Sequence, residues 1–106
     1  MYENMPEIRR LVTFITSKIT PEKIILFGSY ARGDNKDNSD IDLLIIMRDL
    51  KNEREVTGLL YKSLLTENIT IPIDLIAIDF EKYNKLKNKN GYIYKTIERE
   101  GKVVYE

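Results

Sequence analysis

The 106-residue sequence contains no cysteine, no histidine and no tryptophan. The absence of cysteine excludes disulfides and thiol nucleophiles. The absence of histidine excludes Ser-His-Asp and Cys-His catalysis, and without either residue zinc fingers are excluded as well. Any metal ion that the chain binds must therefore sit on oxygen ligands, which favours Mg²⁺, Mn²⁺ or Ca²⁺.

Neither sign of charge is in excess, because 17 basic side chains balance 17 acidic ones. This balance argues against a protein whose main work is to coat nucleic acid or to lie on an anionic membrane. No apolar run approaches the roughly 18 residues of a membrane span, and no signal-peptide pattern opens the chain. We expect a cytoplasmic protein with no direct nucleic-acid or membrane partner, folded as one domain over residues 1–106.

The spacing of apolar residues predicts alternating helices and strands. Helices are expected over residues 5–19, 30–33, 52–65, 79–87 and 92–100, and strands over 23–27, 40–47, 71–78 and 103–105. In the third helix, the buried stripe is expected to comprise Val56, Leu59, Leu60 and Leu64. The strand over 40–47 is apolar at successive positions, which is typical of a strand covered on both faces. The order predicts a layered α/β (α+β) domain.

Three carboxylates lie in or beside these apolar strands. Asp40 and Asp42 are two residues apart, so their side chains are expected on one face, about 6.6 Å apart along the chain. Asp74 lies inside the next apolar strand, where a lone buried carboxylate would be costly. If these two strands are neighbours, the three acids can converge on one side of the sheet. Such a set predicts an oxygen-ligand site for one or two Mg²⁺ ions.

A glycine-serine pair precedes these acids, directly after the buried strand over 23–27. Gly28 and Ser29 form a turn in which backbone amides and a hydroxyl can approach a phosphate chain closely. A phosphate-binding turn followed by metal-binding carboxylates suits chemistry on a nucleoside triphosphate, because the metal neutralises charge and an acid deprotonates the incoming hydroxyl.

These residues carry a resemblance to a known family. Gly28-Ser29, ten residues and then Asp40-Ile41-Asp42 match the GS-x10-DxD signature of the nucleotidyltransferase superfamily that includes DNA polymerase β. The string GSYARGDNKDNSDIDLLI, the later IPIDLIAID and the tail IYKTIEREGKVVYE resemble the minimal nucleotidyltransferases. The chain is similar in particular to the antitoxin of prokaryotic HEPN/minimal-nucleotidyltransferase toxin–antitoxin pairs. The resemblance implies the nucleotidyltransferase fold, with a small mixed sheet flanked by helices.

The resemblance also implies roles for individual residues. Asp40 and Asp42 would hold the metal ions that bridge the triphosphate. Asp74 would share a metal and help to activate the acceptor hydroxyl. Gly28 and Ser29 would contact the β- and γ-phosphates of ATP, and Arg32, which matches the ARG of the family string, would pair with a phosphate. Two of these residues have plainer interpretations, since Asp74 could be an edge-strand acid that faces water and Arg32 an exposed helix arginine without a ligand.

The activity that the resemblance implies is Mg²⁺-dependent transfer of AMP from ATP to a tyrosine of a HEPN-domain ribonuclease toxin, which silences the toxin. Two alternatives stay open. The chain could neutralise its partner by steric cover without catalysis, or it could be the catalytic piece of an antibiotic-modifying enzyme or a template-independent polymerase. In a chain of this length we expect no second domain to bind the acceptor, and this favours an acceptor protein that brings its own docking surface.

Overall fold

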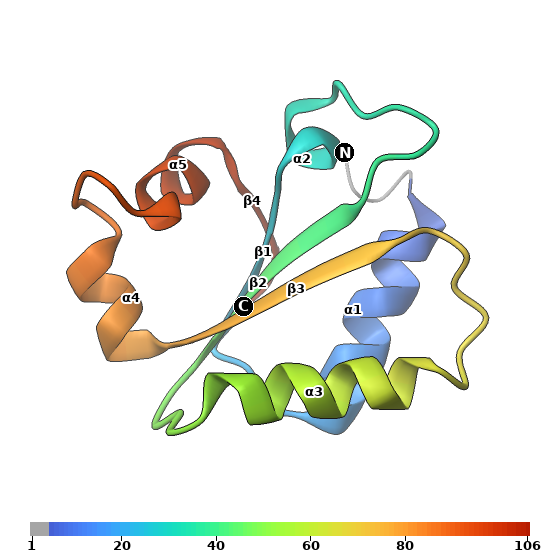
Figure 1. The fold of residues 1–106 in the computed structure, drawn as a ribbon, viewed down its shortest axis with the longest axis horizontal. Helices are drawn as coiled ribbons and strands as arrows, with labels where there is room; N and C mark the ends of the chain where they lie inside the picture. The colour runs from blue at the N-terminus through green and yellow to red at the C-terminus, as the bar shows by residue number, and fades with distance from the viewer. Residues whose placement is uncertain (1–4) are drawn as a thin grey trace.

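The computed structural model describes residues 5–106, so the first four residues of the predicted domain lie outside the described part. Helices and strands follow the order expected from the sequence (Figure 1). The helices are α1 (Pro6–Lys18), α2 (Ser29–Arg32), α3 (Glu53–Leu64), α4 (Phe80–Leu86) and α5 (Ile93–Glu100). The strands are β1 (Lys23–Phe27), β2 (Ile41–Met47), β3 (Ile73–Asp79) and β4 (Lys102–Tyr105).

The four strands form one mixed sheet in the order β3-β2-β1-β4. Strand β1 is antiparallel to both β2 and β4, whereas β2 and β3 run parallel. The parallel pair is joined through α3, which serves as the crossover that such a connection needs. The prediction of an α/β (α+β) domain with a small mixed sheet flanked by helices is confirmed.

Helices cover both faces of the sheet, with α1 and α3 on one side and α4 and α5 on the other (Figure 1). Leu43 and Ile45 of β2 point to the first side, where they pack with Leu11 of α1 and Leu60 of α3. Leu44 and Ile46 of β2 point to the second side, where the core includes buried residues of α4 and α5. Burial on both faces explains why β2 is apolar at successive positions, as the sequence predicted.

Two sequence predictions need correction. Leu59 was expected in the buried stripe of α3 but is 51% exposed, because the face of this helix that meets the sheet follows the i, i+4 line through Leu60. The predicted strand over 71–78 starts at Ile73 and ends at Asp79. Pro72 lies just before the strand, where its carbonyl accepts a hydrogen bond of 2.8 Å from the N–H of Ile41.

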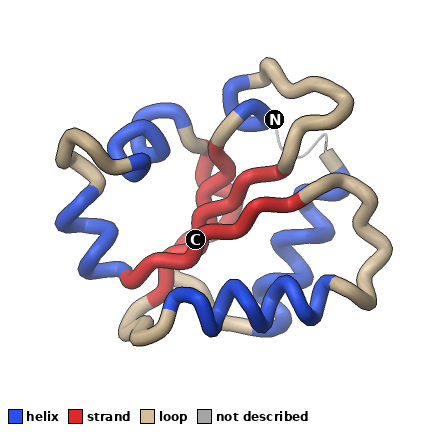
Figure 2. The backbone as a smooth tube through the Cα atoms, in the orientation of Figure 1, coloured by secondary structure: helices blue, strands red, loops and turns tan. Residues whose placement is uncertain are grey.

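Three segments meet at one end of the sheet. Strand β1 ends there, while β2 and β3 both begin there, because β1 runs antiparallel to the other two. The loop between α2 and β2 and the loop between α3 and β3 lie beyond this end (Figure 2). The candidate site residues lie on or next to this end of the sheet, on α2, at the start of β2 and β3, or directly before α2 and β2. Separately, no helix within residues 5–106 is long and apolar enough to cross a bilayer.

Candidate active site

The predicted acids of two strands lie side by side. Asp42 of β2 and Asp74 of β3 are register partners in the parallel pair, so their backbones are about 4.8 Å apart, the ordinary spacing of neighbouring strands. Side chains alternate between the two faces along a strand, so Asp42 points to the same face as Leu44 and Ile46. Asp74 lies beside Asp42 in the register and points to that face as well, which α4 and α5 cover further along. The convergence that the sequence made conditional on neighbouring strands is therefore present for this pair.

Asp40 lies just before β2 and is exposed. Its charge and that of Asp74 both act on Asp42. The pKa of Asp42 is raised to about 6, first by burial and then by repulsion from Asp74 and from Asp40, while the nearby cation of Arg32 opposes the rise. The three carboxylates thus form one electrostatic group centred on Asp42, and a cation placed among them would relieve the repulsion.

Gly28 brings the end of β1 against the same carboxylate. Its φ of 75° and ψ of −157° are a conformation that side-chain-bearing residues avoid. A Cβ at this position would lie 2.2 Å from Oδ2 of Asp42. Only a glycine lets the backbone pass this close to the acid, so the phosphate-binding turn that the sequence predicted adjoins a predicted metal ligand directly.

Ser29 begins the single turn of α2 and is half-buried. Its carbonyl accepts hydrogen bonds from the N–H groups of Gly33 and Asp34, at 2.9 and 3.1 Å. Gly33 ends the turn with a φ of 85°. This short closed turn holds the Ser29 hydroxyl beside the end of β1.

Arg32 is half-exposed and pairs with two acids. Its Nε donates to Oδ2 of Asp34 at 3.2 Å, and its Nη1 lies 3.7 Å from Oε1 of Glu100. The Asp34 hydrogen bond and charge raise the pKa of Arg32, which remains a cation at any physiological pH. The arginine is therefore near the carboxylate group, as its effect on Asp42 shows, but it is held by neighbours that the sequence did not point to.

A hollow of about 220 Å³ opens beside Gly28, between the end of β1 and α5. Apolar side chains form much of its wall, and the Arg32–Glu100 ion pair lies on its wall too. The lining residues are Phe27, Gly28, Arg32, Ile93, Thr96, Ile97 and Glu100. Helix α5 thus contributes to the surroundings of the site, although no motif of the sequence assigned it a part.

The donor set fits a magnesium site in its chemistry. All the acidic side chains at this end of the sheet offer oxygen ligands, which Mg²⁺ prefers. Within residues 5–106, however, no three of them stand gathered at metal-binding distance. Burial, and then repulsion from Asp74 and Asp40, raises the pKa of Asp42, and a bound cation would offset that repulsion. The side chains of Asp40, Asp42 and Asp74 would have to turn inward to share an ion.

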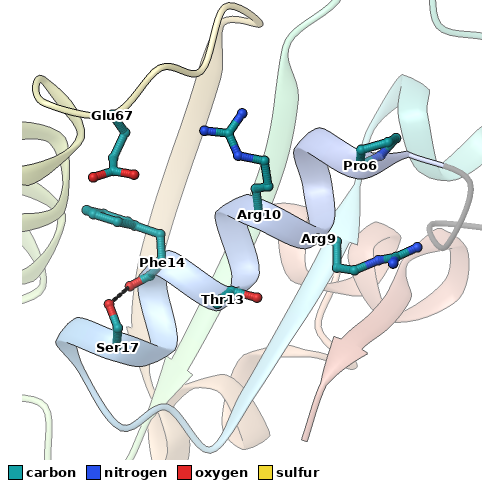
Figure 3. Close-up of a pocket in the computed structure, with 7 residues that line it drawn as sticks. All are labelled: Pro6, Arg9, Arg10, Thr13, Phe14, Ser17 and Glu67. Carbon is teal, nitrogen blue, oxygen red and sulfur yellow. Dashed lines mark hydrogen bonds between the residues drawn. The ribbon is translucent and has the colours of Figure 1, made fainter.

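A larger hollow than the one beside Gly28 lies elsewhere, on the outer face of α1 (Figure 3). It measures about 470 Å³ and is lined by none of the predicted site residues. Figure 3 shows Arg10 and Phe14 of α1 facing Glu67, which follows α3. The Arg10 side chain donates to the carbonyl of Asn68 at 3.2 Å. No carboxylate pair borders this hollow, so its size alone does not make it the place for phosphate chemistry.

Glu100 is the residue that sequence reasoning missed. It is 68 positions away from Arg32 and belongs to a tail that matched the family only in general pattern. A glutamate in an amphipathic helix carries no signal of its own. Only the folded arrangement, in which the end of α5 lies against the end of β1, brings it to the site.

Comparison with known proteins supports the family resemblance that the sequence showed. Residues 8–104 match the nucleotidyltransferase domain family. The chain is 38% identical over 100 residues to a Methanocaldococcus jannaschii protein named "Putative protein adenylyltransferase", covering 92% of this chain and 94% of that one. A second protein of that name and organism is 33% identical over 93 residues, covering 88% and 86%.

Solved structures share the fold. One is a crystal structure of a "putative nucleotidyltransferase" from Sulfolobus solfataricus, with a TM-score of 0.62 and 20% identity over 95% of this chain and 78% of that one. Another is described as a toxin-antitoxin with AMP-PNP, with a TM-score of 0.60 and 24% identity over 92% and 71%. The resemblance seen in the GS-x10-DxD signature is confirmed at the level of the family: this chain belongs to the nucleotidyltransferase-domain family of enzymes.

Proposed function

We propose that the protein is a Mg²⁺-dependent adenylyltransferase that moves AMP from ATP to a tyrosine hydroxyl of a HEPN-domain ribonuclease toxin and so acts as its antitoxin in the cytoplasm. The observation that carries the catalytic part is the contact between the Gly28 turn and the Asp42 carboxylate, with Asp74 beside it. The relatives named as protein adenylyltransferases support AMP as the transferred group and a protein as the acceptor.

Each site residue has a definite part in this proposal. Asp40, Asp42 and Asp74 would hold the metal, which supplies charge neutralisation on the triphosphate when bound. Gly28 and Ser29 would contact the β- and γ-phosphates through the backbone amides and the hydroxyl of this turn. These residues fix the phosphates rather than react with them, so most of the catalysis is positioning and electrostatics.

The bond formed, the bond broken and the proton acceptor of the proposed transfer step can each be named. The acceptor hydroxyl oxygen forms a bond to the α-phosphorus, and the bond from that phosphorus to the bridging oxygen breaks, so that pyrophosphate leaves. Asp74 accepts the hydroxyl proton. The order of strands puts Asp74 on β3, the Asp40–Asp42 pair at β2 and the Gly28 turn at β1. The acceptor therefore approaches from the β3 side, opposite to the phosphate-binding turn.

The proposal also specifies a partner protein. The structural neighbour described as a toxin-antitoxin with AMP-PNP supports an assembly of this kind. The HEPN domain and the tyrosine rest on the family resemblance of the sequence. The competing possibility is an antitoxin that covers its partner without catalysis, and it predicts that the carboxylates are dispensable for neutralisation.

Labelled ATP separates these possibilities. The chain would be purified with the protein that accompanies it and incubated with Mg²⁺ and ATP carrying ³²P at either the α- or the γ-phosphate. Adenylyl transfer labels the partner from the α-position only. Label from the γ-position would show phosphorylation instead, and no label from either with the complex intact would favour steric cover. The Asp40→Asn/Asp42→Asn variant is the control, and it should bind the partner without labelling it.

A further inference from the structure

Arg32 is held from two directions. Asp34 lies two residues along the chain, and its carboxylate accepts from Nε at 3.2 Å. Glu100 comes from the last residue of α5, and its Oε1 lies 3.7 Å from Nη1. The two carboxylates face different nitrogens of the guanidinium. Because a guanidinium carries five N–H donors in a rigid plane, two such partners fix its orientation and still leave donors for a phosphate.

The position of Glu100 is set by the residue that follows it. The N–H of Gly101 donates to the carbonyl of Ile97 at 2.7 Å. A Cβ on Gly101 would lie 2.5 Å from Cγ2 of Ile25 and 2.5 Å from the Ile97 carbonyl oxygen. The end of α5 is therefore pressed against β1, one residue away from Glu100. This close packing fixes the backbone next to Glu100, whose side chain lines the hollow beside Gly28.

Stability does not account for this glutamate. A negative charge in the last turn opposes the helix macrodipole, which favours cations there. An ion pair whose two side chains are 45% and 32% exposed contributes little to folding. Arg99 also contacts Glu100, through Nη2 at 3.3 Å from Oε2, so the carboxylate is steadied on its other oxygen. A residue that opposes the charge preference of its helix without stabilising the fold is typical of a functional position.

We propose that Glu100 is a positioning residue that holds the Arg32 guanidinium on the wall of the hollow beside Gly28, oriented for the triphosphate. This inference rests on the proposed function, because it takes Arg32 to bind a phosphate. An arginine fixed before the nucleotide arrives loses less side-chain freedom on binding, so the benefit appears in nucleotide affinity. Glu100 itself touches no reacting atom.

A double-mutant cycle tests the inference. The dissociation constant for ATP with Mg²⁺ would be measured by titration calorimetry for the wild-type chain, Glu100→Gln, Arg32→Gln and the double variant. We expect Glu100→Gln to weaken binding by about 3- to 10-fold, with KM for ATP raised and kcat nearly unchanged. In the Arg32→Gln background the same change should have no further effect. Glu106→Gln, which removes an exposed carboxylate after β4, is the matched control and should leave binding unchanged.

The outcomes are distinct. Additive losses for the two variants, or unchanged or tighter binding by Glu100→Gln, would overturn the positioning role while leaving the proposed transferase intact. A wild-type chain that binds no ATP would overturn both. If Glu100→Gln lowers the unfolding temperature, Asp34→Asn provides the second variant, because it removes the other partner of Arg32 without altering α5. It should weaken ATP binding only when Arg32 is present, and additivity there would also overturn the inference.

Discussion

The backbone of Gly28 lies so close to the carboxylate of Asp42 that a Cβ at position 28 would fall 2.2 Å from Oδ2. The contact joins two parts of the signature that are separated by more than ten residues in sequence. It brings the Gly28 turn and the acidic group into direct contact.

Replacement of Gly28 by alanine should damage both stability and transfer. The backbone conformation alone would cost about 1–3 kcal/mol for a residue with a side chain, and the new methyl group would also displace the Asp42 carboxylate. Chemical denaturation and α-label transfer measure the two effects. Gly91→Ala is the matched control, because Gly91 also has a positive φ, of 90°, but a Cβ there meets nothing within 4 Å. It should lose stability without losing transfer, and equal transfer by both variants would contradict the account.

Asp42→Asn should make the protein more stable and inactive at once. The pKa of Asp42 is about 6 in the folded state against 3.8 for the free group, so the folded protein binds more protons between these values. Stability therefore falls as the pH rises from about 4 to about 6, because the ionised Asp42 carboxylate is partly buried and is also repelled by Asp74 and Asp40. Asparagine removes this loss.

The gain from Asp42→Asn at pH 7.5 without divalent metal should be about 1 kcal/mol once solvent screening is allowed for. The gain should become small at about pH 3, where most Asp42 is protonated in both states. Urea denaturation at the two pH values provides the measurement. A variant that is less stable than the wild type at pH 7.5 would show that the carboxylate is stabilised rather than strained in the fold.

Mg²⁺ should raise the unfolding temperature of the wild-type chain. An ion that binds only the folded state at ten times its dissociation constant adds about 1.4 kcal/mol. Thermal unfolding with MgCl₂ and, as a control for ionic strength, with NaCl would measure this. The Asp40→Asn/Asp42→Asn variant should respond equally to both salts. A Mg²⁺ effect that survives in this variant would place the ion elsewhere on the molecule.

Asp74→Asn should separate chemistry from nucleotide binding. Asp74 lies on the β3 side of the site, away from the Gly28 turn, and its carboxylate is the proton acceptor in the proposed step. We expect kcat to fall by about 10²- to 10⁴-fold while the dissociation constant for ATP changes by less than about tenfold. Pre-steady-state transfer and calorimetry supply the two numbers. A loss confined to ATP affinity would make Asp74 a nucleotide ligand only.

Much of the fold was predictable because the local signals are strong. The Asn52 side chain accepts from the N–H of Glu55 at 3.1 Å and caps α3 where the predicted helix over 52–65 begins. The β-branched run before Gly28 forms β1 as expected. The prediction that Leu59 is buried was wrong. Helical spacing indicates which residues of α3 are apolar, but it does not indicate which side of the helix packs against the sheet.

The sequence indicated candidate site residues, but not how the fold arranges them. The two-residue spacing of Asp40 and Asp42 indicated a shared face, but the register that puts Asp74 opposite Asp42 depends on strand pairing, which periodicity does not encode. The contact between Gly28 and Asp42 and the ion pair between Arg32 and Glu100 depend on tertiary packing. Their residues are far apart in the chain, so no local pattern could indicate them.

The most direct test of the central claim is the intact mass of the protein that co-purifies with this chain, measured after incubation with ATP and Mg²⁺. The account predicts a gain of one or more AMP units on that protein, and no gain when the Asp40→Asn/Asp42→Asn variant replaces the wild-type chain. An unchanged mass with the wild-type chain, in a complex that remains assembled and binds ATP, would contradict it.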